Sequence, residues 1–141
     1  DNPSLTNRLY SGFSPLRIVL DRTNQLTKRH TLLKDDEPLL IINENARRDL
    51  KPMKEQWTID VNLEEIVRRL YSEKKIGRLI IEGGAQTINS FLKANLWDCA
   101  LIFNSPSVLS NGVKSPNIMG YLVDRKSFGE DELLVINKKI C

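Results

Sequence analysis

The sequence predicts an α/β fold in which helices cover a mixed sheet. Three observations support this prediction. Apolar runs of strand length recur along the chain, two segments with helical apolar spacing lie among them, and the C-terminal part is rich in β-branched runs. With 141 residues, 40% apolar and 28% charged, the chain has the size and composition of one ordinary globular domain. We therefore expect a single domain over residues 1–141.

Three strands are expected in the first half of the chain. Residues 16–20 (LRIVL) form a short run of branched side chains that ends at Asp21 and a polar loop. Residues 38–42 (PLLII) are almost continuously apolar, which is typical of a strand covered on both faces. Residues 57–61 (WTIDV) alternate between apolar and polar and predict a short edge strand.

The clearest helix is expected after Asn62, which is a preferred cap residue. Glu64 and Glu65 follow it, and their negative charges suit the positive end of a helix dipole. Apolar residues recur at helical spacing from Leu63 to Tyr71, and we expect Gly77 to end the helix.

The C-terminal part predicts three more strands. Residues 98–103 (DCALIF) form one, and residues 121–123 and 133–136 most simply form an antiparallel hairpin. Residues 104–120 are rich in Ser, Asn, Pro and Gly and predict a long irregular loop. Long loops in compact domains tend either to bind ligands or to be disordered.

Residues 79–92 (LIIEGGAQTINSFL) are the most informative stretch. They predict a buried strand that ends in Glu82, two glycines that break it, and a helix that starts at once. Glycines let a ligand approach the backbone, and the first N–H groups of a helix attract anions. The order therefore predicts a phosphate site with Glu82 beside it. An ordinary strand-to-helix turn is the competing interpretation, because neither a G-x-G-x-x-G fingerprint nor a P-loop is present.

Charge and residue types restrict the class of ligand. A net charge of +3 suits an anionic small molecule, whereas the scattered basic residues do not predict a nucleic-acid partner. The apolar runs are too short to span a membrane. Two cysteines, Cys99 and Cys141, with the single His30 make no metal-ligand set, so we expect no metal. Because nothing in the sequence supports a disulfide between the two cysteines, we expect the protein to lie in a reducing cytoplasm.

The start of the chain predicts a piece of a longer polypeptide. Asp1 is not an initiator Met, and residues 1–6 (DNPSLT) are typical of a loop. The first expected strand follows without an earlier element to pair with it.

Four motifs resemble, in order, the reductase domain of the bifunctional riboflavin-biosynthesis deaminase/reductase. They are residues 1–8 (DNPSLTNR), 15–22 (PLRIVLDR), 81–85 (IEGGA) and 91–98 (FLxxxLWD). The resemblance implies a dihydrofolate-reductase-like fold and the use of NADPH to reduce 5-amino-6-(5-phosphoribosylamino)uracil to the ribitylamino compound. It also implies a homodimer and a multifunctional parent with a zinc-dependent deaminase before this domain.

Family members carry a strand, a helix and another strand before the first motif. The resemblance is therefore to a domain that lacks its first strand–helix–strand. It implies that the isolated chain has no measurable reductase activity, and that it self-associates through an open sheet edge or was cut from a longer folded protein.

The resemblance also assigns site residues. Asp1 is similar to a loop aspartate at the nicotinamide end, where it would contact the cofactor and donate or relay a proton as a catalytic residue. Leu5 and Arg8 match contacts to the phosphoribosyl substrate, and Glu82 matches the substrate-binding glutamate. The remaining positions match cofactor contacts, namely Arg22, Gly84, Ala85, Gln86, Thr87, Ile88, Asn89 and Ser90.

The chemistry of these residue types agrees with those roles. Arg8 is a permanent cation for a ribose phosphate, and Glu82 can accept hydrogen bonds from pyrimidine N–H groups. Arg22 suits the 2′-phosphate of NADPH. Each residue also has a purely structural interpretation: a solvated arginine for Arg8 and Arg22, and a helix-capping carboxylate for Glu82.

Two other functions stay open. One is a dihydrofolate-reductase-like enzyme that reduces another pyrimidine or a pterin. The other is a non-catalytic module for nucleotide binding or dimerisation.

Overall fold

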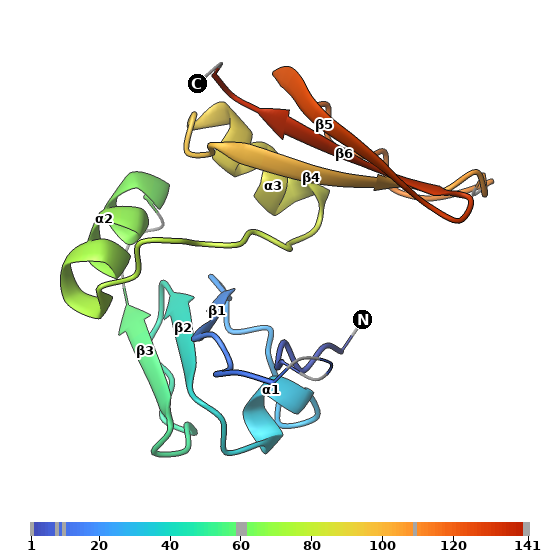
Figure 1. The fold of residues 1–141 in the computed structure, drawn as a ribbon. Coiled ribbons are helices and arrows are strands. Elements are labelled where there is room, and N and C mark those ends of the chain that lie inside the picture. The colour runs from blue at the N-terminus through green and yellow to red at the C-terminus, as the bar shows by residue number, and fades with distance from the viewer. Residues whose placement is uncertain (1, 8, 10, 59–61, 109, 140–141) are drawn as a thin grey trace. The chain divides into compact units, whose positions relative to one another are not determined.

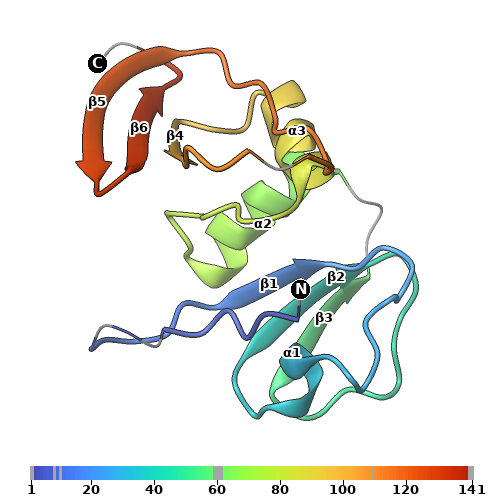
Figure 2. The ribbon, with the colours of Figure 1, turned by 90° about the vertical axis from the view of Figure 1, so that its right-hand side faces the viewer.

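Three parallel strands form the sheet of the N-terminal part of the chain, and three antiparallel strands form that of the C-terminal part (Figures 1 and 2). The computed structural model describes residues 2–7, 9, 11–58, 62–108 and 110–139. The chain divides into two units, Asp1–Asn62 and Leu63–Cys141. The single domain expected over residues 1–141 stays a prediction.

The first unit contains the strands β1 (Arg17–Leu20), β2 (Leu39–Asn43) and β3 (Lys54–Thr58) in the order β1-β2-β3. The strands predicted at 16–20 and 38–42 are therefore confirmed. Strand β3 shares Trp57 and Thr58 with the strand predicted at 57–61, and it is an edge strand of its sheet as expected. It begins at Lys54 because Leu39 to Asn43 of β2 pair in register with Lys54 to Thr58. Residues 59–61 of the predicted strand lie outside the described residues.

Strand β2 is the centre of the first unit. All five of its residues are buried, as the apolar run predicted. On one face, Leu39 and Ile41 pack with Leu32 and Leu33 of the short helix α1 (Thr31–Lys34). The half-buried side chains around this cluster come from the loops and from β1: Leu5, Val19, Leu26 and Leu50. Helix α1 has only four residues, too few to show a helical period in the sequence.

A charged network is buried beside this core. Arg17, at the start of β1, donates two hydrogen bonds to the carboxylate of Asp35, at 2.7 and 2.8 Å. Lys54 Nζ, at the start of β3, donates to the same carboxylate at 2.7 Å and to the carbonyl of Glu37 at 2.7 Å. The Arg17 and Lys54 side chains are 1% and 0% exposed. Buried cations need such partners, so this network ties β1, β3 and the loop before β2 together.

The second unit contains the helices α2 (Leu63–Lys74) and α3 (Ala85–Lys93) and a sheet of the strands β4 (Cys99–Asn104), β6 (Asp131–Asn137) and β5 (Tyr121–Phe128), in that order across the sheet. The predicted hairpin is confirmed as β5 and β6. The irregular loop between β4 and β5 is also confirmed over its described residues.

Helix α2 begins after Asn62 and carries Glu64 and Glu65 in its first turn, as predicted. Ile66 and Leu70 are buried, whereas Tyr71 is 68% exposed and does not belong to the apolar face. The prediction that Gly77 ends this helix is wrong. Lys75 adopts a left-handed φ of 57°, and the N–H groups of Lys75 and Ile76 donate to carbonyls of the last turns. The helix therefore closes before the glycine.

The prediction of a buried strand over residues 79–82 is wrong. Residues 75–84 form no helix or strand, and Ile80 is 73% exposed. The apolar run is real, but a strand also needs a neighbour that accepts and donates its backbone hydrogen bonds. In the part of the chain that the structure describes, neither sheet pairs with this segment.

The charged network predicts how stability depends on acid. Hydrogen bonds from Arg17, helped by Lys54, hold the pKa of Asp35 well below its usual range. The carboxyl of the unfolded chain titrates near 4, so its stabilising contribution is present above about pH 4 and is lost as the pH falls below that value. Urea unfolding at a series of pH values measures this loss.

Asp35→Asn should lower the free energy of unfolding at neutral pH by about 3 kcal/mol, because Arg17 and Lys54 would stay buried without their counter-ion. Its stability should then fall less steeply than that of the wild type between pH 5 and pH 3. Asp36→Asn is the matched control, because the Asp36 side chain is 86% exposed and, among the described residues, forms its ion pair with Lys51. Equal effects of the two substitutions would contradict the role given to the buried network.

Candidate functional site

The turn before α3 is the first part of the candidate site. Gly84 occupies the cap position with extended backbone, at φ −64° and ψ 171°, and no side chain caps the helix. The carbonyl of Gly84 accepts the first helical hydrogen bond, from the N–H of Ile88 at 3.2 Å. The predicted order of two glycines and then a helix start is thus confirmed, although the strand expected before them is absent.

The two glycines have different roles. A Cβ atom on Gly83 would lie 2.8 Å from Cβ of Thr87, which is closer than side chains pack. A Cβ atom on Gly84 would have no heavy atom within 4 Å. Gly83 therefore lets the turn pack against the first turn of the helix, and Gly84 leaves the approach to the helix N-terminus open.

The N-terminus of α3 can attract an anion. In the described ranges, no protein acceptor takes the backbone N–H groups of Ala85, Gln86 or Thr87. The first turn carries no acidic side chain, whereas Lys93 in the last turn complements the negative end of the dipole. Unpaired N–H groups at the positive end of a nine-residue helix are suited to a phosphate oxygen.

The predicted residues around this turn differ in their environment. Glu82 is exposed, and its carboxylate forms no ion pair or hydrogen bond within the described residues. Ala85, Thr87, Ile88 and Asn89 are half-buried, and Gln86 is exposed. The hydroxyl of Ser90 donates to the carbonyl of Gln86 at 3.0 Å, so it faces its own helix rather than a ligand.

Arg22 lies in the first unit, directly after the residue that follows β1. Its side chain is 64% exposed and forms an ion pair with Glu44, with Nη2 and Oε1 2.5 Å apart. Nε of Arg22 lies 2.6 Å from the same oxygen. A phosphate at Arg22 would therefore compete with Glu44, a partner that the sequence pattern did not indicate.

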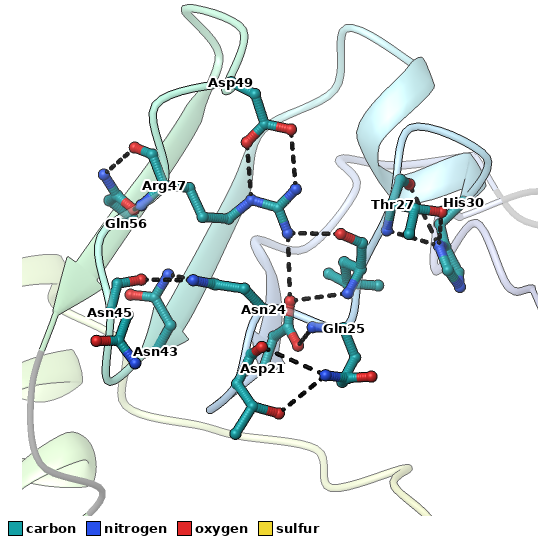
Figure 3. A network of polar contacts seen from close by, with 12 residues as sticks. Asp21, Asn24, Gln25, Thr27, His30, Asn43, Asn45, Arg47, Asp49 and Gln56 are labelled. Carbon is teal, nitrogen blue, oxygen red and sulfur yellow. Dashed lines mark hydrogen bonds and ion pairs between the residues drawn. The ribbon is translucent and has the colours of Figure 1, made fainter.

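A polar network holds the loop that follows β1 (Figure 3). The buried carboxylate of Asp21 accepts the N–H groups of Gln25 and Leu26, at 2.6 and 3.1 Å. Nη1 of Arg47 lies 3.4 Å from Asp21, and Arg47 also donates to both oxygens of Asp49 at 3.0 Å. Those bonds from Arg47 lower the pKa of Asp49. Sequence reasoning missed this network, since Arg47 lies in a polar loop without a periodic pattern.

Amide side chains extend this network along the carboxyl ends of the strands. Asn43, the last residue of β2, donates to Oδ1 of Asn24 at 2.9 Å, and Asn24 donates to the carbonyl of Asn45 at 2.7 Å (Figure 3). Asn24 has a left-handed φ of 57°, which asparagine tolerates better than most residues. The carboxyl edge of a parallel sheet is where α/β proteins bind ligands, and here its loops are fixed by side-chain hydrogen bonds.

Two predicted residues, Asp1 and Arg8, lie outside the described residues. Leu5, between them in sequence, is half-buried with a left-handed φ of 52° and packs against the α1–β2 cluster. Leu5 and Arg22 belong to the first unit, whereas Glu82 and Gly84 to Ser90 are contiguous in the second. In the described part of the chain, no group of acidic, histidine and cysteine side chains could hold a metal ion, and no helix could cross a membrane.

These features define an α/β protein with a parallel and an antiparallel sheet and a helix N-terminus suited to a phosphate. The profile of the RibD C-terminal domain family matches residues 1–125, and the chain belongs to this family.

Individual relatives agree with this assignment. The riboflavin biosynthesis protein RibD of Aquifex aeolicus is 29% identical over 120 residues, which cover 80% of this chain and 33% of that protein. The chain thus spans about a third of the length of this curated relative. Two solved structures share its fold. The first is a diaminohydroxyphosphoribosylaminopyrimidine deaminase/5-amino-6-(5-phosphoribosylamino)uracil reductase from Thermotoga maritima. It has a TM-score of 0.82 and 24% identity, and the match covers 97% of this chain and 41% of that one. The second is RibD of Acinetobacter baumannii, with a TM-score of 0.84, 22% identity and a match that covers 97% of this chain and 43% of that one. The predicted dihydrofolate-reductase-like α/β fold is confirmed.

The two glycines predict different outcomes on substitution. Gly83→Ala should lower the free energy of unfolding by about 1–3 kcal/mol, because the added methyl group would overlap Thr87. Gly84→Ala should change it by less than about 0.5 kcal/mol, since the site is open and the backbone is not left-handed. Denaturant unfolding measures both. A larger loss for Gly84→Ala than for Gly83→Ala would contradict the geometry of the turn.

Proposed function

We propose that this chain is part of an NADPH-dependent reductase of riboflavin biosynthesis, which converts 5-amino-6-(5-phosphoribosylamino)uracil to the ribitylamino compound. The observation that carries the proposal is the match of the RibD C-terminal domain family to residues 1–125. The Thermotoga maritima protein of similar fold is a 5-amino-6-(5-phosphoribosylamino)uracil reductase. In this chain, the accessible turn and the helix N-terminus at Gly84 support the proposal.

The residues of the turn fit a dinucleotide. The open approach at Gly84 and the unpaired N–H groups of Ala85 to Thr87 would hold its phosphates. Arg22 would hold the 2′-phosphate, which would have to displace Glu44. Bound in this way, the cofactor would supply a hydride to the opened sugar imine of the substrate.

The remaining residues would bind the substrate and move a proton. Arg8 would pair with the ribose phosphate and Leu5 would contact the phosphoribosyl group. The exposed carboxylate of Glu82 would accept hydrogen bonds from the pyrimidine. Asp1 would donate or relay the proton that accompanies hydride addition. We further propose a homodimer in the cytoplasm and a parent protein with a zinc-dependent deaminase.

The direct test is an assay of the full-length protein with 5-amino-6-(5-phosphoribosylamino)uracil. We expect loss of NADPH absorbance and formation of the ribitylamino product, with NADH a poorer donor. Dihydrofolate and a pyrimidine without the ribose phosphate are the comparison substrates. Turnover of either of them without turnover of the phosphoribosylamino compound would replace this proposal with the alternative reductase. Absence of any turnover with bound NADPH would favour a non-catalytic module.

Two arginine substitutions should separate substrate from cofactor. Arg8→Ala in the full-length protein should raise the KM of the substrate by about 10- to 100-fold, because a charge-assisted phosphate contact contributes on the order of 1.5–3 kcal/mol. The KM of NADPH should stay within about twofold. Arg22→Ala should have the opposite pattern and should weaken NADPH more than NADH. Equal weakening of both ligands by Arg8→Ala would mean that Arg8 acts through the structure.

A further inference from the structure

Arg17 makes more hydrogen bonds than its ion pair with Asp35 requires. Its guanidinium has five N–H groups, and all five have acceptors. Beyond the two bonds to Asp35, Nε donates to the carbonyl of Pro38 at 3.1 Å and Nη2 to that of Glu37 at 2.8 Å. The fifth bond runs from Nη1 to the carbonyl of Ser4 at 2.8 Å. In the sequence, Ser4 follows Asp1, the proposed catalytic residue, and precedes Leu5 and Arg8, the two residues assigned to the phosphoribosyl group.

The hydrogen bond from Arg17 to the Ser4 carbonyl differs from an ordinary loop contact because its donor is a buried cation. Two cations, Arg17 and Lys54, share the single carboxylate of Asp35, so the buried network carries an excess positive charge. Backbone carbonyls must solvate that excess, and hydrogen bonds to a buried cation are stronger than neutral ones. The Ser4 carbonyl is one of these acceptors, which makes its position costly to change.

Two further contacts hold the same segment. Oδ1 of Asn2 accepts the N–H of Thr31, at the start of α1, at 2.9 Å. Leu5 packs against the apolar cluster of α1 and β2 in a left-handed conformation that a leucine adopts only under constraint. Residues 2–6 are therefore fixed by a surface hydrogen bond, a buried cation and an apolar contact.

We propose that Arg17 is a positioning residue for the substrate: it fixes residues 2–6, and with them the position from which Leu5 contacts the phosphoribosyl group. This inference rests on the proposed function. A shift of the segment by about 1 Å would move the Leu5 contact by a comparable distance, and such displacements reduce catalysis strongly.

The structure offers a matched control. Arg47 is a second buried arginine of the same unit, with its side chain 7% exposed and with two carboxylate partners, Asp21 and Asp49. Its remaining described bonds join Leu26 and Gln56, and none reaches residues 2–6. Arg17→Lys and Arg47→Lys both keep the charge and remove the planar fork. The two substitutions should therefore lower Tm by similar amounts but should have different effects on the KM of the substrate.

The experiment compares the two variants in the full-length protein. For Arg17→Lys we expect the substrate KM to rise about tenfold while the KM of NADPH stays within about twofold. For Arg47→Lys we expect the substrate KM within about twofold of the wild type, whereas the KM of NADPH should rise, because Arg47 fixes the loop that carries Arg22. Hydrogen exchange of the amides of residues 4–7 should become faster in Arg17→Lys only. An equal rise of the substrate KM in both variants, or unchanged exchange in Arg17→Lys, would overturn the inference.

Asn2→Ala keeps the proposal testable if Arg17→Lys does not fold, because it removes an exposed anchor of the same segment without touching the buried network. It should raise the substrate KM about threefold and leave Tm nearly unchanged, and an unchanged substrate KM would count against the proposal. A wild-type protein that does not reduce the phosphoribosylamino compound would refute the proposed function instead. The exchange measurement would then decide whether Arg17 fixes the segment.

Discussion

The carboxylate of Asp35 is the constraint on which the first unit depends. It is the counter-ion of two buried cations, Arg17 on β1 and Lys54 on β3, which lie on the two outer strands of the sheet. Desolvated charges are tolerated only with close partners, so the strands, the loop before β2 and the Ser4 carbonyl must take up one arrangement together. The apolar packing of β2 stabilises the unit, and the charges select its geometry.

A second charged network has a similar function at the opposite end of β1. Asp21 and Arg47 fix the loop that carries Arg22, and Asn24 and Asn43 join that loop to the end of β2. The loops at the carboxyl edge are thereby held by side chains rather than by a helix. Arg22 itself is exposed and paired with Glu44 at the rim of this edge. A fixed loop with an accessible arginine at its start is suited to a phosphate that replaces the carboxylate.

The sequence predicted the elements whose signals are local. The apolar run of β2, the spacing of α2 and the hairpin of β5 and β6 are all confirmed. Residues 79–82 have an equally apolar run, but a strand depends on a distant neighbour that no local pattern describes. The same limit explains why the charged networks were missed, since Arg17 and Asp35 are 18 residues apart and meet only in the folded chain. Of the candidate site, the glycine turn and helix start were predictable because they are contiguous, whereas the pairing of Arg22 with Glu44 was not.

Binding of the cofactor phosphates at the N-terminus of α3 is the central step of the proposed function. Titration of the isotope-labelled full-length protein with NADPH, followed through the backbone amide resonances of Ala85, Gln86 and Thr87, tests this claim without any turnover. We predict large, saturable shifts of these three amides at the same NADPH concentration that saturates the protein. Saturable binding of NADPH that leaves all three amides unshifted would contradict the account.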